Sequence, residues 1–223
     1  MLRRRLLKSR PAGHISAFFR PRSARSSASG GENTNLWSAV PIFKSLAIFS
    51  GVVLAVVLIY CFRDGGFHME YSISRYVGRE MWSAGVFLVG NLVIVGLMYE
   101  YVMEVWRKYG KLWLTLMAVM MVCFVGLSLC PIGLFDANYG EYGVVSILHQ
   151  IFSRGMFMTM AVIALVMGVR LFKVGKKMAW VCLAYVGLAI ILGVMSVVTK
   201  IFWDLNFMLE TAYIYLFMIM LML

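Results

Sequence analysis

The sequence predicts an all-α fold: a polytopic transmembrane helical bundle of about six spanning helices, with both chain ends on the inner side of the membrane. Hydrophobic residues make up 62% of the 223-residue chain, and charged residues make up 14%. A water-soluble domain of this size could not cover so much apolar surface with so few polar side chains. The apolar residues also gather into runs of about 20, the length that a helix needs to cross a bilayer.

Residues 1–38 are predicted to be a disordered basic tail. The tail has no acid before Glu32, and its basic residues are Arg3, Arg4, Arg5, Lys8, Arg10, Arg20, Arg22 and Arg25. Such a segment lacks the apolar residues that would build a core, and its arginines would hold it on the inner side, in contact with anionic lipids. The alternative is a mitochondrial targeting segment, because presequences are also rich in Arg and Ser and poor in acids.

Residues 39–223 are predicted to form the six-helix transmembrane domain. Each spanning helix needs about 20 predominantly apolar residues. Six runs meet this requirement, and in chain order they cover residues 42–62, 83–103, 112–130, 144–169, 178–199 and 207–223. The sixth run differs from the others because it carries Glu210 in its first turn.

The loops between these runs predict the orientation, because Lys and Arg gather in the loops on the inner side of a membrane. Besides the tail, two loops are strongly basic, and they hold Arg107, Lys108 and Lys111, then Arg170, Lys173, Lys176 and Lys177. The alternating loops hold most of the acids, which are Asp64, Glu70, Glu80, Asp136, Glu141 and Asp204. A count of six helices places every basic loop on one side, so both chain ends are predicted to lie inside.

Within the second run, Asn91 is a polar residue near the predicted centre of the bilayer. It is surrounded along the sequence by Gly85, Gly90 and Gly96. Small residues let two helices approach closely, and an amide can hydrogen-bond across the interface that they form. We therefore predict a packing role for Asn91, with a place on an ion or substrate path as the alternative.

The fourth run begins with a polar turn that must face protein or water. Its polar residues are Ser146, His149, Gln150, Ser153 and Arg154. The loop that contains Ser74 and Arg75 and the loop that contains Asp136 are predicted to lie on the same outer side. The candidate ligand-binding residues are therefore Ser74, Arg75, Asp136, His149 and Arg154.

In this outer polar cluster, Arg75 and Arg154 would hold an anionic headgroup or a carboxylate. Asp136 would pair with one of the arginines, and His149 would titrate near neutral pH. The alternative is a purely structural cap, in which Arg154 pairs with Asp136 or Glu141 to satisfy charges that the fold buries.

Several classes of protein do not fit the sequence. The cysteines, which are Cys61, Cys123, Cys130 and Cys182, show no CxxC or Cys/His spacing, so neither a disulfide framework nor a metal site is predicted. Bis-histidine haem binding needs facing histidines, and His149 is the one histidine within an apolar run. The chain has no HExxH, no GxSxG and no P-loop. We predict no enzyme activity, no cofactor and, because the basic residues follow the topology, no nucleic-acid partner.

Three short stretches carry a resemblance to a known family. They are Ile73-Ser74-Arg75-Tyr76-Val77-Gly78 before the second run, Pro131-Ile132-Gly133-Leu134-Phe135-Asp136 after the third, and His149. The pattern resembles an uncharacterised prokaryotic family of six-helix integral membrane proteins, a domain of unknown function. It is more distantly similar to DRAM/FRAG-like membrane proteins. The resemblance covers residues 42–223 and implies a membrane fold; the chain departs from the pattern in Asp136 and in one extra residue before Gly78.

The sequence thus predicts a multi-pass membrane protein that binds a lipid or a small anion at the outer polar cluster. A small transporter or channel component is one alternative, suggested by Asn91 and Arg154 within the runs. An accessory subunit of a larger membrane complex is another, suggested by the basic tail and the many aromatic side chains. The expected location is the cell membrane, or the mitochondrial inner membrane if the tail is a targeting segment.

Overall fold

The computed structural model describes residues 34–64, 66–131, 143–175, 177–198 and 205–223. These residues form helices and contain no strand, so the all-α class is confirmed for this part of the chain. The helices are α1 (Thr34–Asp64), α2 (Ile73–Val77), α3 (Met81–Leu129), α4 (Val144–Lys173), α5 (Met178–Val198) and α7 (Asn206–Met222). The chain divides into the units Met1–Asn33 and Thr34–Leu223. Helix α1 begins four residues before the predicted end of the tail.

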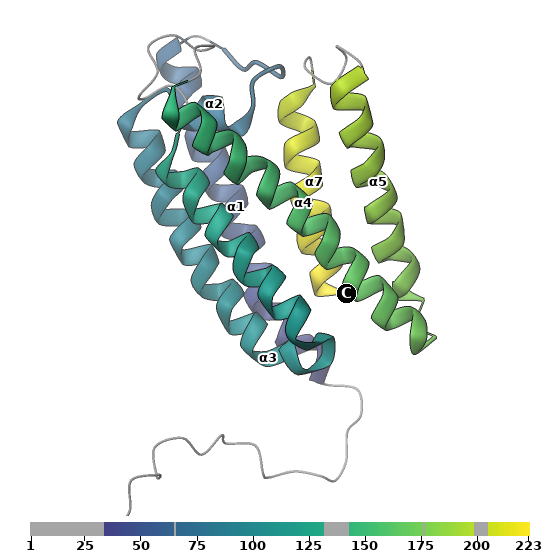
Figure 1. The fold of residues 1–223 in the computed structure, drawn as a ribbon. Helices are drawn as coiled ribbons and strands as arrows, with labels where there is room; N and C mark the ends of the chain where they lie inside the picture. Colours follow the sequence, from purple (N-terminus) through teal and green to yellow (C-terminus); the bar gives the residue numbers. More distant parts are fainter. Residues whose placement is uncertain (1–33, 65, 132–142, 176, 199–204) are drawn as a thin grey trace, which may run out of the picture. The chain divides into compact units, whose positions relative to one another are not determined.

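Helix α3 turns back on itself at Gly110. This residue has φ 86° and ψ 178°, a conformation that residues with a Cβ rarely adopt. Asn91 and Ser128 lie 37 positions apart within α3, yet the Asn91 amide donates a hydrogen bond to Ser128 Oγ at 2.6 Å. A straight helix would separate them by about 55 Å, at 1.5 Å per residue. Residues 81–109 and 111–129 are therefore two antiparallel arms, which Figure 1 shows side by side.

Within the described residues, three helices are long and apolar enough to cross a membrane. They lie at Ala39–Arg63, Met81–Leu129 and Val144–Lys173, and the second of them contains both arms of α3. Two shorter apolar helices lie at Met178–Val194 and Asn206–Met222. Large apolar side chains also point outwards, including Phe62 and Trp82, which are 87% and 78% exposed. An apolar exterior of this kind needs lipid or protein to cover it.

The long helices pack one against the next in chain order, and the last helix, α7, returns to the first, α1. Helix α1 packs on α3, α3 on α4, and α4 on α5, whereas α7 returns to α1 and also contacts α5. Figure 1 shows α7 beside α4 and α5. Among the described residues, the largest side chains that are fully buried include Phe49, Trp113 and Phe217, from α1, α3 and α7. The core therefore runs through the bundle rather than lying under one face.

Helix α2 is a short element that lies against three other helices. It contacts α1, α3 and α7, and it begins where the side chain of Ser72 accepts a hydrogen bond from the backbone N–H of Arg75 at 3.2 Å. The hydroxyl of Tyr76 donates to the carbonyl of His68 at 2.6 Å and accepts from the His68 N–H at 2.7 Å. Burial raises the pKa of Tyr76, so the hydroxyl keeps the proton that it donates. These bonds fix α2, and with it Ser74, at the end of the bundle.

Candidate functional site

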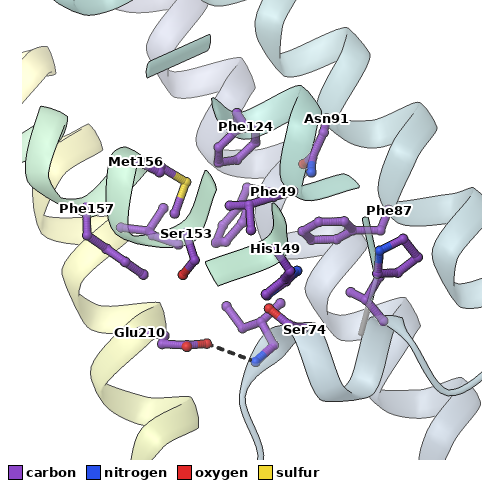
Figure 2. A pocket seen from close by; sticks show the side chains of 15 residues that line it. Phe49, Ser74, Phe87, Asn91, Phe124, His149, Ser153, Met156, Phe157 and Glu210 are labelled. Carbon is purple, nitrogen blue, oxygen red and sulfur yellow. Dashed lines mark hydrogen bonds between the residues drawn. The ribbon is translucent and has the colours of Figure 1, made fainter. Parts of the chain in front are cut away.

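A small space, which we call the polar cavity, lies where α1, α2, α3, α4 and α7 meet (Figure 2). Its volume is about 40 Å³. The polar side chains on its wall are Ser74, Asn91, His149, Ser153 and Glu210. The apolar wall is formed by Phe49, Ile73, Val77, Phe87, Phe124, Leu127, Pro131, Met156, Phe157 and Ile214. The polar side chains thus border a space whose wall is otherwise apolar.

His149 is held in one orientation by the end of α3. The residue is 6% exposed, and its Nδ1 atom lies 2.8 Å from the carbonyl oxygen of Cys130. A carbonyl oxygen can only accept, so Nδ1 must carry the proton and donate it. The neutral ring then has its lone pair on Nε2. The other edge of the imidazole is therefore a hydrogen-bond acceptor.

Asn91 is oriented by the second arm of α3. The hydroxyl of Ser128 donates its one proton to the carbonyl of Phe124 at 3.0 Å. Ser128 Oγ must therefore accept from Asn91, which places the NH₂ group of Asn91 towards Ser128. The Asn91 side chain is almost fully buried, and its Oδ1 atom has no hydrogen-bond partner among the described residues. Because Asn91 lines the polar cavity, this unsatisfied acceptor calls for a donor inside it.

Glu210 joins α7 to α2. Its Oε2 atom accepts a hydrogen bond from the backbone N–H of Ile73 at 3.0 Å, and Figure 2 shows the carboxylate pointing towards α2. The first N–H groups of a helix have no partner within the helix and carry partial positive charge, so a carboxylate is favoured there. Glu210 was not among the candidate ligand-binding residues predicted from the sequence. The signal was present in the sequence, because an acid inside an apolar run is a functional candidate by default.

A second and larger space, which we call the lateral groove, lies between α4, α5 and α7. Its volume is about 530 Å³, within the range of about 300–1,000 Å³ that is common for ligand sites. The lining residues are Arg154, Phe157, Met158, Ala161, Val162, Ala189, Ile190, Leu192, Gly193, Asn206, Leu209, Glu210 and Tyr213. Most of them are apolar, and Glu210 borders both the lateral groove and the polar cavity.

The residues of the predicted outer polar cluster lie in different places. Ser74 and His149 line the polar cavity, whereas Arg154 lines the lateral groove. The guanidinium of Arg75 stacks over the ring of Tyr71, with 3.7 Å from its central carbon to the ring centroid, a cation–π arrangement. Asp136 lies outside the described residues. So does Glu141, the other acid that was predicted as a partner of Arg154. The structure therefore brings Ser74 and His149 together and assigns the two arginines to separate surroundings.

Within the part of the chain that the structure describes, no group of three His, Cys, Asp or Glu side chains could hold a metal ion. A search against models of known protein families gives no match, and neither do searches of curated proteins and of solved structures. The resemblance to the prokaryotic six-helix family and to DRAM/FRAG-like proteins therefore stays a prediction.

Proposed function

We propose that this chain is a six-span integral membrane protein whose lateral groove binds an acyl chain of an anionic membrane lipid, with Arg154 contacting the headgroup. Six spans would comprise α1, the two arms of α3, α4, α5 and α7. Helix α5 has 21 residues and would be about 31 Å long, close to the hydrocarbon thickness of about 30 Å. Helix α7 has 17 residues, the shortest length that commonly spans a bilayer. The cell membrane is the proposed location.

The observation that carries the proposal is an apolar groove with an arginine on its border. The groove residues on α4 run from Arg154 to Val162, a distance of about 12 Å at 1.5 Å per residue. One leaflet of hydrocarbon is about 15 Å thick, so the groove suits part of one acyl chain. A groove of this composition that opens among spanning helices faces lipid tails, which makes a lipid the natural occupant.

The position of Arg154 suits a headgroup contact. Arg154 is the eleventh residue of α4, so it would lie about 15 Å along the helix from its first residue. Its guanidinium donates to Gln150 Oε1 at 3.3 Å, one turn nearer the start of the helix. A long basic side chain below the interface extends towards the headgroups in this way. The carboxylate of Glu210, which also borders the groove, points at the backbone N–H of Ile73. The side of the groove that offers a positive charge to a phosphate is therefore the side at Arg154.

The experiment is native mass spectrometry of the protein released from mild detergent, with any bound lipid identified by mass. We expect the wild type to retain a phospholipid with a net negative charge. Arg154→Gln should reduce its occupancy at least about tenfold, since a charge-assisted hydrogen bond contributes about 1.5–3 kcal/mol. Ala161→Phe, which fills the groove, should remove lipid of every headgroup class.

A matched control is Arg63→Gln. Arg63 lies at the end of α1, does not line the groove, and forms an exposed ion pair with Glu80 at 3.0 Å. Such surface pairs contribute little to stability, so this variant should keep the lipid. Equal lipid loss in Arg63→Gln and Arg154→Gln would contradict the proposal, because it would show a response to net charge rather than to the groove.

A further inference from the structure

The polar cavity presents mainly hydrogen-bond acceptors to whatever occupies it. Asn91 Oδ1 is buried and has no partner among the described residues. In neutral His149, Nε2 is an acceptor, because Nδ1 carries the one ring proton and donates it to the carbonyl of Cys130. When it is ionised, the carboxylate of Glu210 can only accept. The hydroxyls of Ser74 and Ser153 can turn to donate or to accept, so they adapt to the occupant.

An anion does not fit this wall. None of the described residues that line the polar cavity is Lys or Arg, and the acid among them is Glu210. A carboxylate within an apolar helix is costly unless a positive charge balances it. Among the described lining residues, His149 alone can become positive, and its protonation would turn Nε2 from an acceptor into a donor. While His149 is neutral and Glu210 is ionised, a water chain would satisfy Asn91 Oδ1 but leave the carboxylate unbalanced, whereas a positively charged occupant would complete the wall.

The size of the cavity limits that occupant to a small ion. A single water molecule occupies about 10–15 Å³ of cavity volume. The polar cavity, at about 40 Å³, therefore has room for about three molecules of that size. One carboxylate balances one positive charge, which favours a monovalent ion. The described residues also contain no cluster of acids and histidines suited to a metal ion of higher charge.

We propose that the polar cavity binds a small monovalent cation, Na⁺, whose charge is balanced by Glu210 and whose water shell donates to Asn91 Oδ1 and His149 Nε2. In Figure 2, Asn91 and Glu210 lie at opposite ends of the view, with His149 and Ser74 between them. In this arrangement, water links the cation beside Glu210 to the acceptor atoms of His149 and Asn91. The proposal does not depend on the lateral groove. The two spaces share Phe157 and Glu210, and their other lining residues differ.

Other titratable groups surround Glu210 and must be considered when pH is varied. His149 faces it across the polar cavity from α4. Arg154, also on α4, lines the lateral groove with it. Helix α2, which packs on α7, carries Arg75 and Tyr76. Of these groups, His149 shares the cavity with Glu210 and could take up a proton there.

The first measurement is retention of radioactive Na⁺ by the purified full chain in detergent at fixed pH, with N-methylglucamine as the replacement cation. We expect Asn91→Leu and Glu210→Gln to weaken retention at least about tenfold. Glu100→Gln removes the same charge from an exposed position of α3 outside the cavity, and it should bind as the wild type does. Glu210→Gln keeps an amide oxygen that can accept from Ile73, so it tests the charge even if Asn91→Leu does not fold.

The second measurement separates bound Na⁺ from a proton on Glu210. If Na⁺ is bound, raising its concentration should raise the thermal midpoint of the wild type, and Glu210→Gln should abolish this effect. If the wild type retains no Na⁺ and its thermal midpoint does not respond to Na⁺, Glu210 carries a proton and the proposal is wrong.

Discussion

The carboxylate of Glu210 on α7 accepts a hydrogen bond at 3.0 Å from the backbone N–H of Ile73, the first residue of α2, although the two residues lie 137 positions apart. The N–H groups at the start of a helix have no partner within it, so Glu210 satisfies a donor that would otherwise be left unpaired beside the core. The same carboxylate borders both the polar cavity and the lateral groove. One acid therefore links the position of α2 to both candidate sites.

Replacing Glu210 should show this link as a change in stability. Glu210→Ala removes the acceptor and leaves the partly buried Ile73 N–H unpaired, which costs about 1–3 kcal/mol. Glu210→Gln retains an acceptor oxygen and should recover most of that loss. Thermal unfolding in detergent gives the comparison, and hydrogen exchange should show faster exchange of the α2 amides in Glu210→Ala. Equal stability of the two variants would contradict the role of the hydrogen bond.

Two glycines of the first α3 arm should respond differently to a methyl group. A Cβ on Gly90 would overlap the side chain of Val52 on α1, whereas a Cβ on Gly96 would have nothing within 4 Å. Gly90→Ala should therefore destabilise the bundle by about 1–3 kcal/mol. Gly96→Ala should be neutral or up to about 1 kcal/mol stabilising, because alanine favours helix. Thermal unfolding of both variants tests this, and a similar effect at both positions would contradict close packing at Gly90.

The sequence was a good guide to the elements that depend on length and hydrophobicity. Apolar runs of about 20 residues can satisfy their backbone in a membrane only as helices, and α1, α3 and α4 lie where such runs were predicted. The pattern around Asn91 also indicated a hydrogen bond across a helix interface, and its partner is Ser128. Of the three glycines that were expected to allow close approach, Gly90 alone meets a neighbouring helix within the described part of the chain.

The neighbours of each polar side chain were harder to predict. Loop charges indicate which side of the membrane a residue lies on, but not its rotation about the helix axis or the helices beside it. Arg75 and Arg154 were therefore grouped together, although one stacks on Tyr71 and the other lines the lateral groove. The contact between Glu210 and Ile73 depends on α7 returning to α2, which no local pattern indicates.

The reversal of α3 depends on a single glycine. With φ 86° and ψ 178°, Gly110 occupies a region that costs other residues about 1–3 kcal/mol. Gly110→Ala should lower the free energy of unfolding by about that amount. A steric clash should add little to this loss of stability, because the nearest atom to the added Cβ belongs to the flexible end of the Arg170 side chain, at 3.2 Å.

The control for Gly110→Ala is Gly187→Ala in α5, where a Cβ would have nothing within 4 Å. This variant should be as stable as the wild type or slightly more stable, because alanine favours helix. Chemical denaturation in detergent, monitored by circular dichroism, measures both. A Gly110→Ala protein as stable as Gly187→Ala would mean that the turn between the arms does not need a positive φ.

The six-span arrangement makes a prediction about the two ends of α4. Ser74 on α2 lies at the end of the bundle where α4 begins, because it lines the polar cavity with His149. Lys173 is the last residue of α4. If α4 spans the membrane and basic loops lie inside, a cysteine at Ser74 should react with an impermeant maleimide in intact cells. A cysteine at Lys173 should react only after permeabilisation. The background must lack Cys61, Cys123, Cys130 and Cys182. Labelling of both positions from one side would show that α4 does not cross the membrane, and the proposed six spans would then be wrong.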